Sequence, residues 1–377
     1  ERSGDLDSRS GRGGDAKIMQ AGSRLHRKIQ GRMGSGYHAE VPLKYRKDWE
    51  RFSLLIEGRA DGIWTEDAFT TIDEIKGTFR EVDRMTEPMR VHLAQARCYA
   101  YIYSEQNQLE KAGVRMVYAN LETEDVRYFT EKWEWLALKA WFDDLMERYY
   151  RWLSFQADWK EQREASLKKL VFPYEYREGQ RELAAGVYRS ILRKKRLFIQ
   201  APTGVGKTLS ALFPALKAVG EGLGDKIFYL TARTITRTVA ADTLDLLREQ
   251  KMRVKSLVLT AKEKLCICQE VQCDPDHCPR AKGHYDRIND AVYDLWTKGP
   301  DSCTREVILT QAEKYQVCPF ELSLDLSLWM DVIICDYNYV FDLNVYLKRF
   351  FGEGVKGEYL FLVDEAHNLV ERGRDMY

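Results

Sequence analysis

The feature that most restricts the fold of this chain is a glycine-rich segment between an apolar run and a helix-like stretch. Leu197–Gln200 is apolar enough to form a short buried strand, and Ala201–Thr208 reads Ala-Pro-Thr-Gly-Val-Gly-Lys-Thr. The stretch from Lys207 to Val219 is then expected to form a helix. A strand, a glycine-rich loop and a helix N-terminus in this order place backbone N–H groups and the helix dipole around an anion. The sequence therefore predicts a phosphate-binding loop in an α/β domain with a parallel sheet.

The residue types in this loop indicate a nucleotide triphosphate with magnesium, that is, ATP and Mg²⁺. Lys207 is expected to reach the β- and γ-phosphates, and Thr208 to ligate the metal. The usual motif begins with glycine, where this chain has Ala201. The predicted nucleotide-binding residues of the loop are Thr203, Gly204, Val205, Gly206, Lys207 and Thr208.

A second apolar run, Leu360–Val363, ends in the tetrapeptide Asp364-Glu365-Ala366-His367. An acidic residue at the tip of a neighbouring strand can hold the magnesium ion, and Asp364 has that place. Glu365 is expected to orient and polarise the attacking water, which makes it the predicted catalytic residue. His367 can couple the nucleotide to a second motor domain.

These two elements together resemble those of superfamily 2 helicases, in which an Ala-Pro-Thr-Gly opening of the loop is common. Tyr176–Gln180 resembles the segment that reads adenine in such motors, which implies that Gln180 contacts the base. Tyr229–Thr234 resembles the strand and loop that touch the DNA backbone, which implies nucleic-acid contacts from Thr231 and Arg233.

Seven of the eight cysteines lie between Cys266 and Cys335, and Cys98 stands apart. The N-terminal residues lack the apolar core of a signal peptide, so a cytoplasmic location is expected. Thiols there are reduced, and clustered cysteines indicate metal ligands before disulfides. Their spacing is not the paired Cys-x-x-Cys pattern of a zinc ribbon, although thiolates suit both zinc and iron–sulfur clusters.

The cysteine segment resembles the cluster domain that the XPD/DinG family of helicases carries between the phosphate loop and the DEAH element. Leu265-Cys266 and Cys318-Pro319-Phe320 match its two ends, and Asp331–Asp342 resembles the segment that follows. The resemblance implies a 4Fe–4S cluster and translocation on single-stranded DNA, typically 5′ to 3′. The implied ligands are Cys266, Cys273, Cys278 and Cys318, with Cys268 as the rival first ligand and Cys303 and Cys335 as structural residues.

The N-terminal part shows a different order of elements, which predicts an α/β unit with an antiparallel component. The expected elements are a helix at 16–35, strands at Tyr37–Leu43, Ser53–Trp64 and Phe69–Gly77, a helix at 88–105, and a hairpin of Val114–Asn120 and Val126–Thr130. Residues 132–169 lack Gly and Pro and predict one or two long helices. Their tryptophans are expected to pack on a helix face rather than to stack on bases.

Four short signals within this part point to metal-dependent cleavage of nucleic acid. His26 lies on the first helix, Asp61 follows a strand turn, and Glu74 and Lys76 lie two apart and share a strand face. Two carboxylates and a histidine can hold Mg²⁺ or Mn²⁺, and the lysine can activate water or stabilise charge. Gln95 and Tyr99 share a helix face and are predicted to hold the DNA strand.

In this order the signals resemble the RecB/Cas4-like branch of the PD-(D/E)XK nucleases. The predicted organisation is a nuclease-like domain at 1–131, a helical linker at 132–170, and a RecA-like motor domain at 171–377. The motor domain would carry a mainly helical iron–sulfur insertion at about 260–322. We expect a fragment of a longer protein, because a helicase needs a second RecA-like domain to close its cleft.

Bulk properties leave these hypotheses open. The chain has 58 basic and 58 acidic residues, so a basic groove for DNA would have to be local, and no apolar run is long enough to span a membrane. The first hypothesis is an ATP-dependent DNA helicase with a metal-dependent nuclease, acting in DNA repair or processing on single-stranded or forked DNA. In the alternative, the nuclease-like domain is catalytically silent and only holds DNA. A third is an RNA-directed ATPase.

Overall fold

The computed structural model describes residues 2–8, 16–202 and 204–376, and the chain forms two compact units. The first contains Glu1–Arg151 and Cys273–Asp276, and the second contains Trp152–Gln272 and His277–Tyr377. Within the first unit, the carbonyl of Cys273 accepts a hydrogen bond of 2.8 Å from the N–H of Ser8. Among the described residues, no helix is long and apolar enough to cross a membrane.

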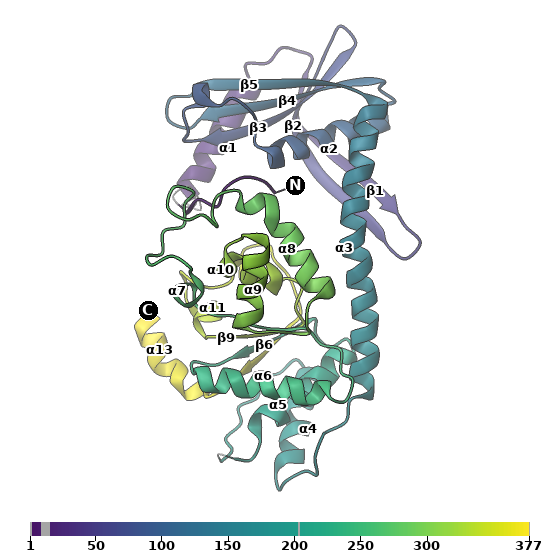
Figure 1. The fold of residues 1–377 in the computed structure, drawn as a ribbon. Coiled ribbons are helices and arrows are strands. Elements are labelled where there is room, and N and C mark those ends of the chain that lie inside the picture. Colours follow the sequence, from purple (N-terminus) through teal and green to yellow (C-terminus); the bar gives the residue numbers. More distant parts are fainter. Residues whose placement is uncertain (1, 9–15, 203, 377) are drawn as a thin grey trace. The chain divides into compact units, whose positions relative to one another are not determined.

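The first unit is built on a five-stranded sheet in the order β1-β2-β3-β4-β5. Its elements are α1 (Ala16–Gln30), β1 (Tyr37–Asp48), β2 (Ser53–Glu66), β3 (Phe69–Thr78), η2 (Val82–Arg84), α2 (Arg90–Asn107), β4 (Lys111–Asn120) and β5 (Val126–Glu134) (Figure 1). The β3–β4 pair is parallel and the other pairs are antiparallel. A parallel pair needs a crossover, which α2 provides. The predicted elements of this part are confirmed, with the first helix ending earlier, at Gln30.

Helices cover both faces of this sheet. On β3, Ile72 belongs to the core cluster beneath α2, whereas Ile75 packs against Leu25 and Ile29 of α1. Successive strand residues point to opposite faces, so Glu74 and Lys76 share the face of Ile72. The alternation thus turns the Glu-x-Lys pair toward α2.

The long helix α3 (Trp135–Lys169) confirms the prediction for the stretch without Gly and Pro. Its first half buries Leu138 and Phe142 in the core of the first unit. In its second half, Trp152 stacks on Trp296, with ring centroids 5.7 Å apart. The tryptophan there lies in a packed core, as the sequence indicated, and not on a face offered to bases.

The second unit has a parallel sheet in the order β10-β6-β9-β7-β8, as predicted for the motor part. Its strands are β6 (Lys226–Leu230), β7 (Ser256–Val258), β8 (Ser302–Cys303), β9 (Val332–Cys335) and β10 (Tyr359–Val363). Its helices are α4 (Gln180–Leu192), α5 (Lys207–Gly220), α6 (Thr234–Arg248), α7 (Lys262–Leu265), α8 (His284–Lys298), α9 (Arg305–Tyr315), α10 (Pro319–Ser327), α11 (Asn338–Phe341), α12 (Lys348–Phe351), η3 (Ala366–Asn368) and α13 (Leu369–Met376).

A hydrophobic core lies on each face of this parallel sheet. Phe228 and Ile333 point into the core shared with α8, α9 and α10. Ile227 and Tyr229 point into the other core, which they share with residues of α5 and α6. The alternation along β6 therefore places the Tyr229 side chain on the α5 face.

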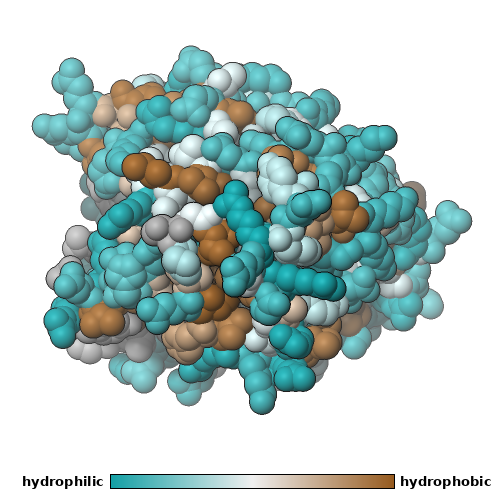
Figure 2. Space-filling view, turned by 90° about the horizontal axis from the view of Figure 1, so that it is seen from below, coloured by the Kyte–Doolittle hydropathy of each residue, from teal (hydrophilic) through white to brown (hydrophobic). Residues whose placement is uncertain are grey.

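One strand prediction for this unit was wrong. Residues 195–200 form no strand, and the side chains of Leu197, Phe198 and Ile199 are 44%, 89% and 44% exposed. A strand is defined by ladder hydrogen bonds to a neighbour, and the described strands pair with one another and not with this segment. Figure 2, seen from the α4 end of this unit in Figure 1, shows apolar patches among hydrophilic residues.

Candidate active sites

In the first unit, α1 and β2 bring two predicted metal ligands together. His26 Nδ1 lies 3.7 Å from Asp61 Oδ1. The other carboxylate oxygen of Asp61 accepts a 2.7 Å hydrogen bond from the N–H of Ile75. This bond ties Asp61 to β3 directly beside Glu74 and Lys76. Asp61 is therefore held by the backbone of the strand that carries the other candidate residues.

Glu74, Lys76, Gln95 and Tyr99 form a continuous chain of contacts. Lys76 Nζ is 2.5 Å from Glu74 Oε1 and 3.3 Å from Gln95 Oε1. Gln95 Nε2 donates to the Tyr99 hydroxyl at 3.2 Å. A Cβ at Gly58 would lie 2.5 Å from that hydroxyl, so the close approach of β2 to Tyr99 requires glycine. The residues predicted for this site thus lie in one unit as two contact groups, His26 with Asp61 and Glu74 with Lys76, Gln95 and Tyr99, which the bond from the Ile75 N–H to Asp61 joins through β3.

Burial dominates the electrostatics of this cluster. Glu74 is 2% exposed, and burial together with the nearby Asp61 raises its pKa to about 7. Burial also raises the pKa of Asp61, against the opposing effects of the Ile75 N–H and His26. Near them, burial and the charge of Lys76 lower the pKa of His92 to about 4. Sequence reasoning missed His92, which precedes Gln95 on α2 by less than one turn.

The second carboxylate oxygen of Glu74 has no hydrogen-bond partner among the described residues. An orphaned buried acceptor can serve a cation that approaches the site. In the described ranges, however, no three His, Cys, Asp or Glu side chains are arranged to hold a metal ion. The positive charge beside Glu74 in this structure is the ammonium of Lys76.

In the second unit, the glycine-rich loop leads into α5 as predicted. Gly204 and Gly206 have φ values of +83° and +79°, which only glycine adopts without strain. The Lys207 ammonium donates to the carbonyl of Ala201 at 3.1 Å, inside its own loop. Thr203, also predicted to bind the nucleotide, lies outside the described residues.

The two predicted magnesium ligands meet at one buried hydroxyl. Tyr229 Oη lies 3.0 Å from Asp364 Oδ2 and 3.4 Å from Thr208 Oγ1. Tyr229 is on β6, and Asp364 follows β10, which pairs with β6 in parallel. The carboxyl end of the sheet thus brings the acid to the start of α5.

The predicted catalytic Glu365 follows at once and has an unusual backbone. Its φ of 51° lies in the left-handed region, which is rare outside glycine and asparagine. Its carboxylate is 3.4 Å from Nδ1 of His367. The acids of the DEAH element are therefore presented on a tightly turned loop.

Gln180 contacts the loop itself. Its side chain is 4% exposed, its Oε1 accepts from the N–H of Arg177, and its Nε2 donates to the carbonyl of Val205 at 3.2 Å. The Arg177 guanidinium also donates to the carbonyl of Gly204 at 2.6 Å. Sequence reasoning missed this role of Arg177, although it lies in the segment singled out. In this structure the segment supports the phosphate loop, and the predicted contact of Gln180 with adenine stays a prediction.

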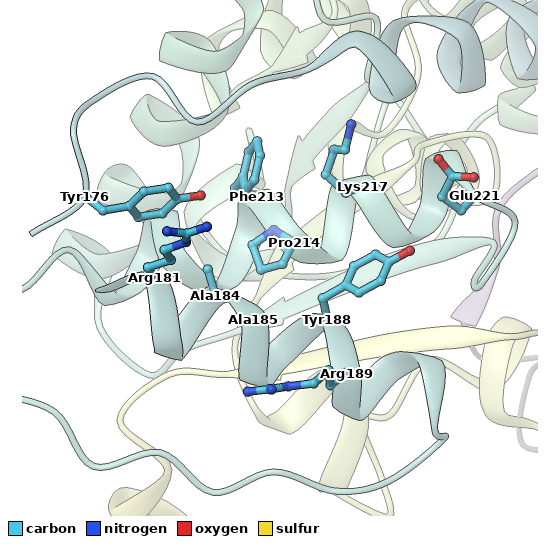
Figure 3. A pocket seen from close by; sticks show the side chains of 10 residues that line it. All are labelled: Tyr176, Arg181, Ala184, Ala185, Tyr188, Arg189, Phe213, Pro214, Lys217 and Glu221. Atoms are coloured by element: carbon cyan, nitrogen blue, oxygen red, sulfur yellow. The ribbon is translucent and has the colours of Figure 1, made fainter. Parts of the chain in front are cut away.

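A pocket of about 360 Å³ lies between α4 and α5 (Figure 3). Aromatic and basic side chains dominate its lining: Tyr176, Tyr188 and Phe213 with Arg181, Arg189 and Lys217. Tyr176 and Arg181 lie at one end of the pocket, and Tyr188 and Arg189 lie toward the other. Helix α4 begins at Gln180, and α5 begins at Lys207 of the phosphate loop. Most of the pocket lining lies further along these two helices, so the pocket extends away from the nucleotide site.

The two predicted nucleic-acid contacts after β6 differ in exposure. Thr231 is 1% exposed, and its hydroxyl contacts that of Thr236. It therefore supports the loop from inside in this structure, and its predicted contact with DNA stays a prediction. Arg233 is exposed and available to a phosphate backbone.

In the second unit, the thiol of Cys268 has two other thiols as neighbours, but the described residues hold no group of three such side chains that is arranged to bind a metal ion. The thiol of Cys268 interacts with the thiols of Cys278 and Cys266, and burial together with these neighbours raises the pKa of Cys268 to about 11. Cys318 is half-buried, and its N–H donates to Nδ1 of the buried His284 at 3.3 Å. The remaining cysteines of the cluster region are Cys273, in the first unit, and the buried Cys303 and Cys335.

Comparison with known proteins finds two family matches, and both lie in the C-terminal part of the chain. Residues 181–278 match the family described as "DEAD/DEAH box helicase", and residues 231–377 match the family DEAD_2. Together the two matches cover residues 181–377, so this part of the chain is similar to DEAD/DEAH box helicases. The matched residues include the loop lysine, Tyr229, the cysteines from Cys266 onward and the DEAH element.

Curated helicases are similar to about half of the chain. Human "Regulator of telomere elongation helicase 1" is 25% identical over 250 residues, which is 52% of this chain and 20% of that protein. The Caenorhabditis elegans homolog is 26% identical over 241 residues, 52% of this chain and 24% of that protein. A solved structure titled "XPD_Helicase" has 21% identity and a TM-score of 0.35, and covers 52% of this chain and 34% of that one. The chain thus spans about a fifth of the length of the first two relatives.

Proposed function

We propose that this chain is part of an ATP-dependent DNA helicase or translocase that also carries a metal-dependent DNA nuclease, acting in DNA repair or processing. The main support for the helicase part of this proposal is that Thr208 and Asp364 both contact the hydroxyl of Tyr229. A lysine, a hydroxyl ligand and two adjacent acids are the set that nucleotide hydrolysis needs.

Each motor residue has a defined task in this proposal. Lys207 neutralises the β- and γ-phosphates, and Thr208 with Asp364 would hold the magnesium ion. Glu365 orients the attacking water. Hydrolysis drives movement along single-stranded or forked DNA, with Arg233 on the backbone, and a second RecA-like domain completes the cleft.

For the first unit, we propose cleavage of DNA by a metal-activated water. His26, Asp61 and Glu74 would hold Mg²⁺ or Mn²⁺, and a bound ion would supply activation of water and polarisation of the phosphate. Lys76 stabilises the developing negative charge, while Gln95 and Tyr99 hold the strand. The support is the pair of His26 and Asp61 and the contact chain from Glu74 to Tyr99, which the β3 backbone at Ile75 holds side by side.

One observation favours a second candidate, in which this unit only holds DNA. Lys76 pairs with Glu74 at 2.5 Å, and a stable ion pair would compete with a metal ion for the carboxylate. Such a unit would bind DNA without cutting it. The two candidates differ in one measurable outcome, the cleavage of DNA when manganese is supplied.

The deciding experiment uses the chain and its Asp61→Ala variant, purified side by side. Labelled single-stranded DNA with Mn²⁺ and without ATP should be cut by the unaltered chain and left intact by the variant, which lacks a metal ligand. Both proteins should bind nucleotide equally. Equal cutting by both would reveal a contaminant, and no cutting by either would support the DNA-holding candidate.

We further propose that Cys266, Cys273, Cys278 and Cys318 hold a 4Fe–4S cluster, with Cys268 as the alternative first ligand. The convergence of thiols at Cys268 supports a soft-metal site in this segment. Protein prepared without oxygen should be brown and contain iron and acid-labile sulfide, and Cys318→Ser should lose the colour. Stoichiometric zinc without iron or sulfide would refute the cluster.

A further inference from the structure

The hydroxyl of Tyr229 sits between the two residues that would bind magnesium. The side chain is 2% exposed and belongs to the core against α5. Its oxygen contacts Asp364 at 3.0 Å and Thr208 at 3.4 Å. These contacts join residues from two strands and the first turn of α5 through one buried group. A tyrosine ring that served only as packing would not need its oxygen at this point.

A second tyrosine holds the backbone of the same loop. Tyr337 is fully buried after β9, and its hydroxyl donates to the carbonyls of Asp364 and, at 3.2 Å, of Glu365. Glu365 has the left-handed backbone described above, a strained conformation that persists only where its surroundings hold it. The Tyr337 hydroxyl is one of the groups that hold it.

We infer that Tyr229 and Tyr337 are positioning residues, which set the side chain of Asp364 and the backbone of Asp364 and Glu365 before magnesium and nucleotide bind. This inference rests on the proposed nucleotide site. Tyr229 fixes the distance between the two ligand side chains, and Tyr337 fixes the direction in which the acids leave β10. A site arranged in advance loses less entropy when the ion binds.

The matched variants are Tyr229→Phe and Tyr337→Phe, which keep the ring and remove only the hydroxyl. Tyr339→Phe is the control, because the buried Tyr339 donates to the carbonyl of Thr260 at 3.4 Å and contacts neither acid. The probe is a fluorescent ATP analogue carrying a methylanthraniloyl group. Its binding to the full chain is measured in EDTA and across a Mg²⁺ titration, together with the thermal unfolding midpoint.

In Tyr229→Phe, the Mg²⁺ concentration for half-maximal binding should rise about tenfold, because a hydrogen bond to a charged group is lost. Binding in EDTA should not change, since the loop and Lys207 are intact. Tyr337→Phe should show a smaller rise, of about threefold, because it acts through the backbone. Tyr339→Phe should match the unaltered chain.

An unchanged magnesium dependence in a folded Tyr229→Phe protein would overturn the inference. An equal loss of binding with and without Mg²⁺, accompanied by a lower unfolding midpoint, would also overturn it, because that pattern reports a purely structural role. If the unaltered chain bound no nucleotide in the presence of Mg²⁺, the proposed nucleotide site itself would fail, and the inference with it. Failure of the nucleotide site appears as absent binding by the unaltered chain. A purely structural role of Tyr229 appears as weaker binding of the variant in EDTA, and an unchanged magnesium dependence appears with normal binding in EDTA. The three outcomes can therefore be told apart.

Discussion

The two candidate active sites of this chain are held by their surroundings in different ways. In the first unit, Asp61, Glu74 and Lys76 stand on neighbouring, paired strands, and α1 and α2 add the other side chains. In the second unit, the acidic loop also follows a paired strand. The phosphate loop, however, follows Leu197–Gln200, which is exposed and belongs to neither sheet.

This difference shows what ladder hydrogen bonds contribute to a site. Side chains on paired strands are arranged before any ligand arrives, so their contacts already exist in the free protein. The phosphate loop follows an unpaired segment, so it takes its geometry from the helix behind it, from the side chains of Arg177 and Gln180, and from the ligand. Changes in packing should therefore affect the first site strongly and the loop side of the second site weakly.

The largest expected effects come from equivalent changes to one acid in each site. Glu74→Gln should lower DNA cleavage by about 10²–10⁴ and Glu365→Gln should lower ATP hydrolysis by a similar factor, because each removes a carboxylate that acts on water or metal. Each variant should keep the other activity, measured on the same preparation with single-stranded DNA present. Loss of both activities in either variant would show that the two sites are not independent.

The next effect tests the packing under the two sites. Ile75, directly before Lys76, is fully buried, whereas Ile199, just before the phosphate loop, is 44% exposed. Ile75→Ala should therefore lower the free energy of unfolding by about 2–5 kcal/mol, and Ile199→Ala by less than about 1 kcal/mol. Urea unfolding of both variants measures this, and equal losses would contradict the exposure of the segment before the loop.

A smaller effect follows from the raised pKa of Glu74, about 7 against an ordinary value of 4.5. As pH rises, the carboxyl group of Glu74 loses its proton near pH 4.5 in the unfolded chain but only near pH 7 in the folded chain. The folded state is therefore stabilised in full below pH 4.5, and this stabilisation is lost as pH rises to about 7. The loss should be roughly 3 kcal/mol. Urea unfolding between pH 4.5 and 7.5 should show this slope in the unaltered chain and a flatter one in Glu74→Gln; parallel slopes would exclude the raised pKa.

The smallest expected effect concerns DNA contact in the second unit. Arg233→Gln should weaken binding of single-stranded DNA a few-fold and reduce the salt dependence by about one released ion. Thr231→Ser, which keeps the buried hydroxyl, should leave both unchanged. Fluorescence anisotropy at several salt concentrations provides the measurement. A larger effect from Thr231→Ser than from Arg233→Gln would reverse the assignment of the exposed contact.

Much of the candidate nuclease cluster could be read from the sequence, because its key spacings are local. Glu74 and Lys76 share a strand face at a separation of two, and Gln95 and Tyr99 share a helix face at a separation of four. His92 was missed because a single histidine on a helix carries no such signal. Its lowered pKa arises from burial and from Lys76, which only the packed unit brings near.

Local sequence by itself determined the helices, most of the strands and the residue pairs within them, since the periods of 2 and 3.6 residues are properties of the backbone. Tertiary structure alone decided that Leu197–Gln200 would remain outside the sheet, because a strand exists only where a partner strand accepts its hydrogen bonds. It also decided that Tyr229 would meet Asp364, 135 positions away, through the parallel pairing of β6 with β10. The spacing of residues within one segment cannot predict this contact, because the order of strands in a sheet depends on the packing of the whole unit.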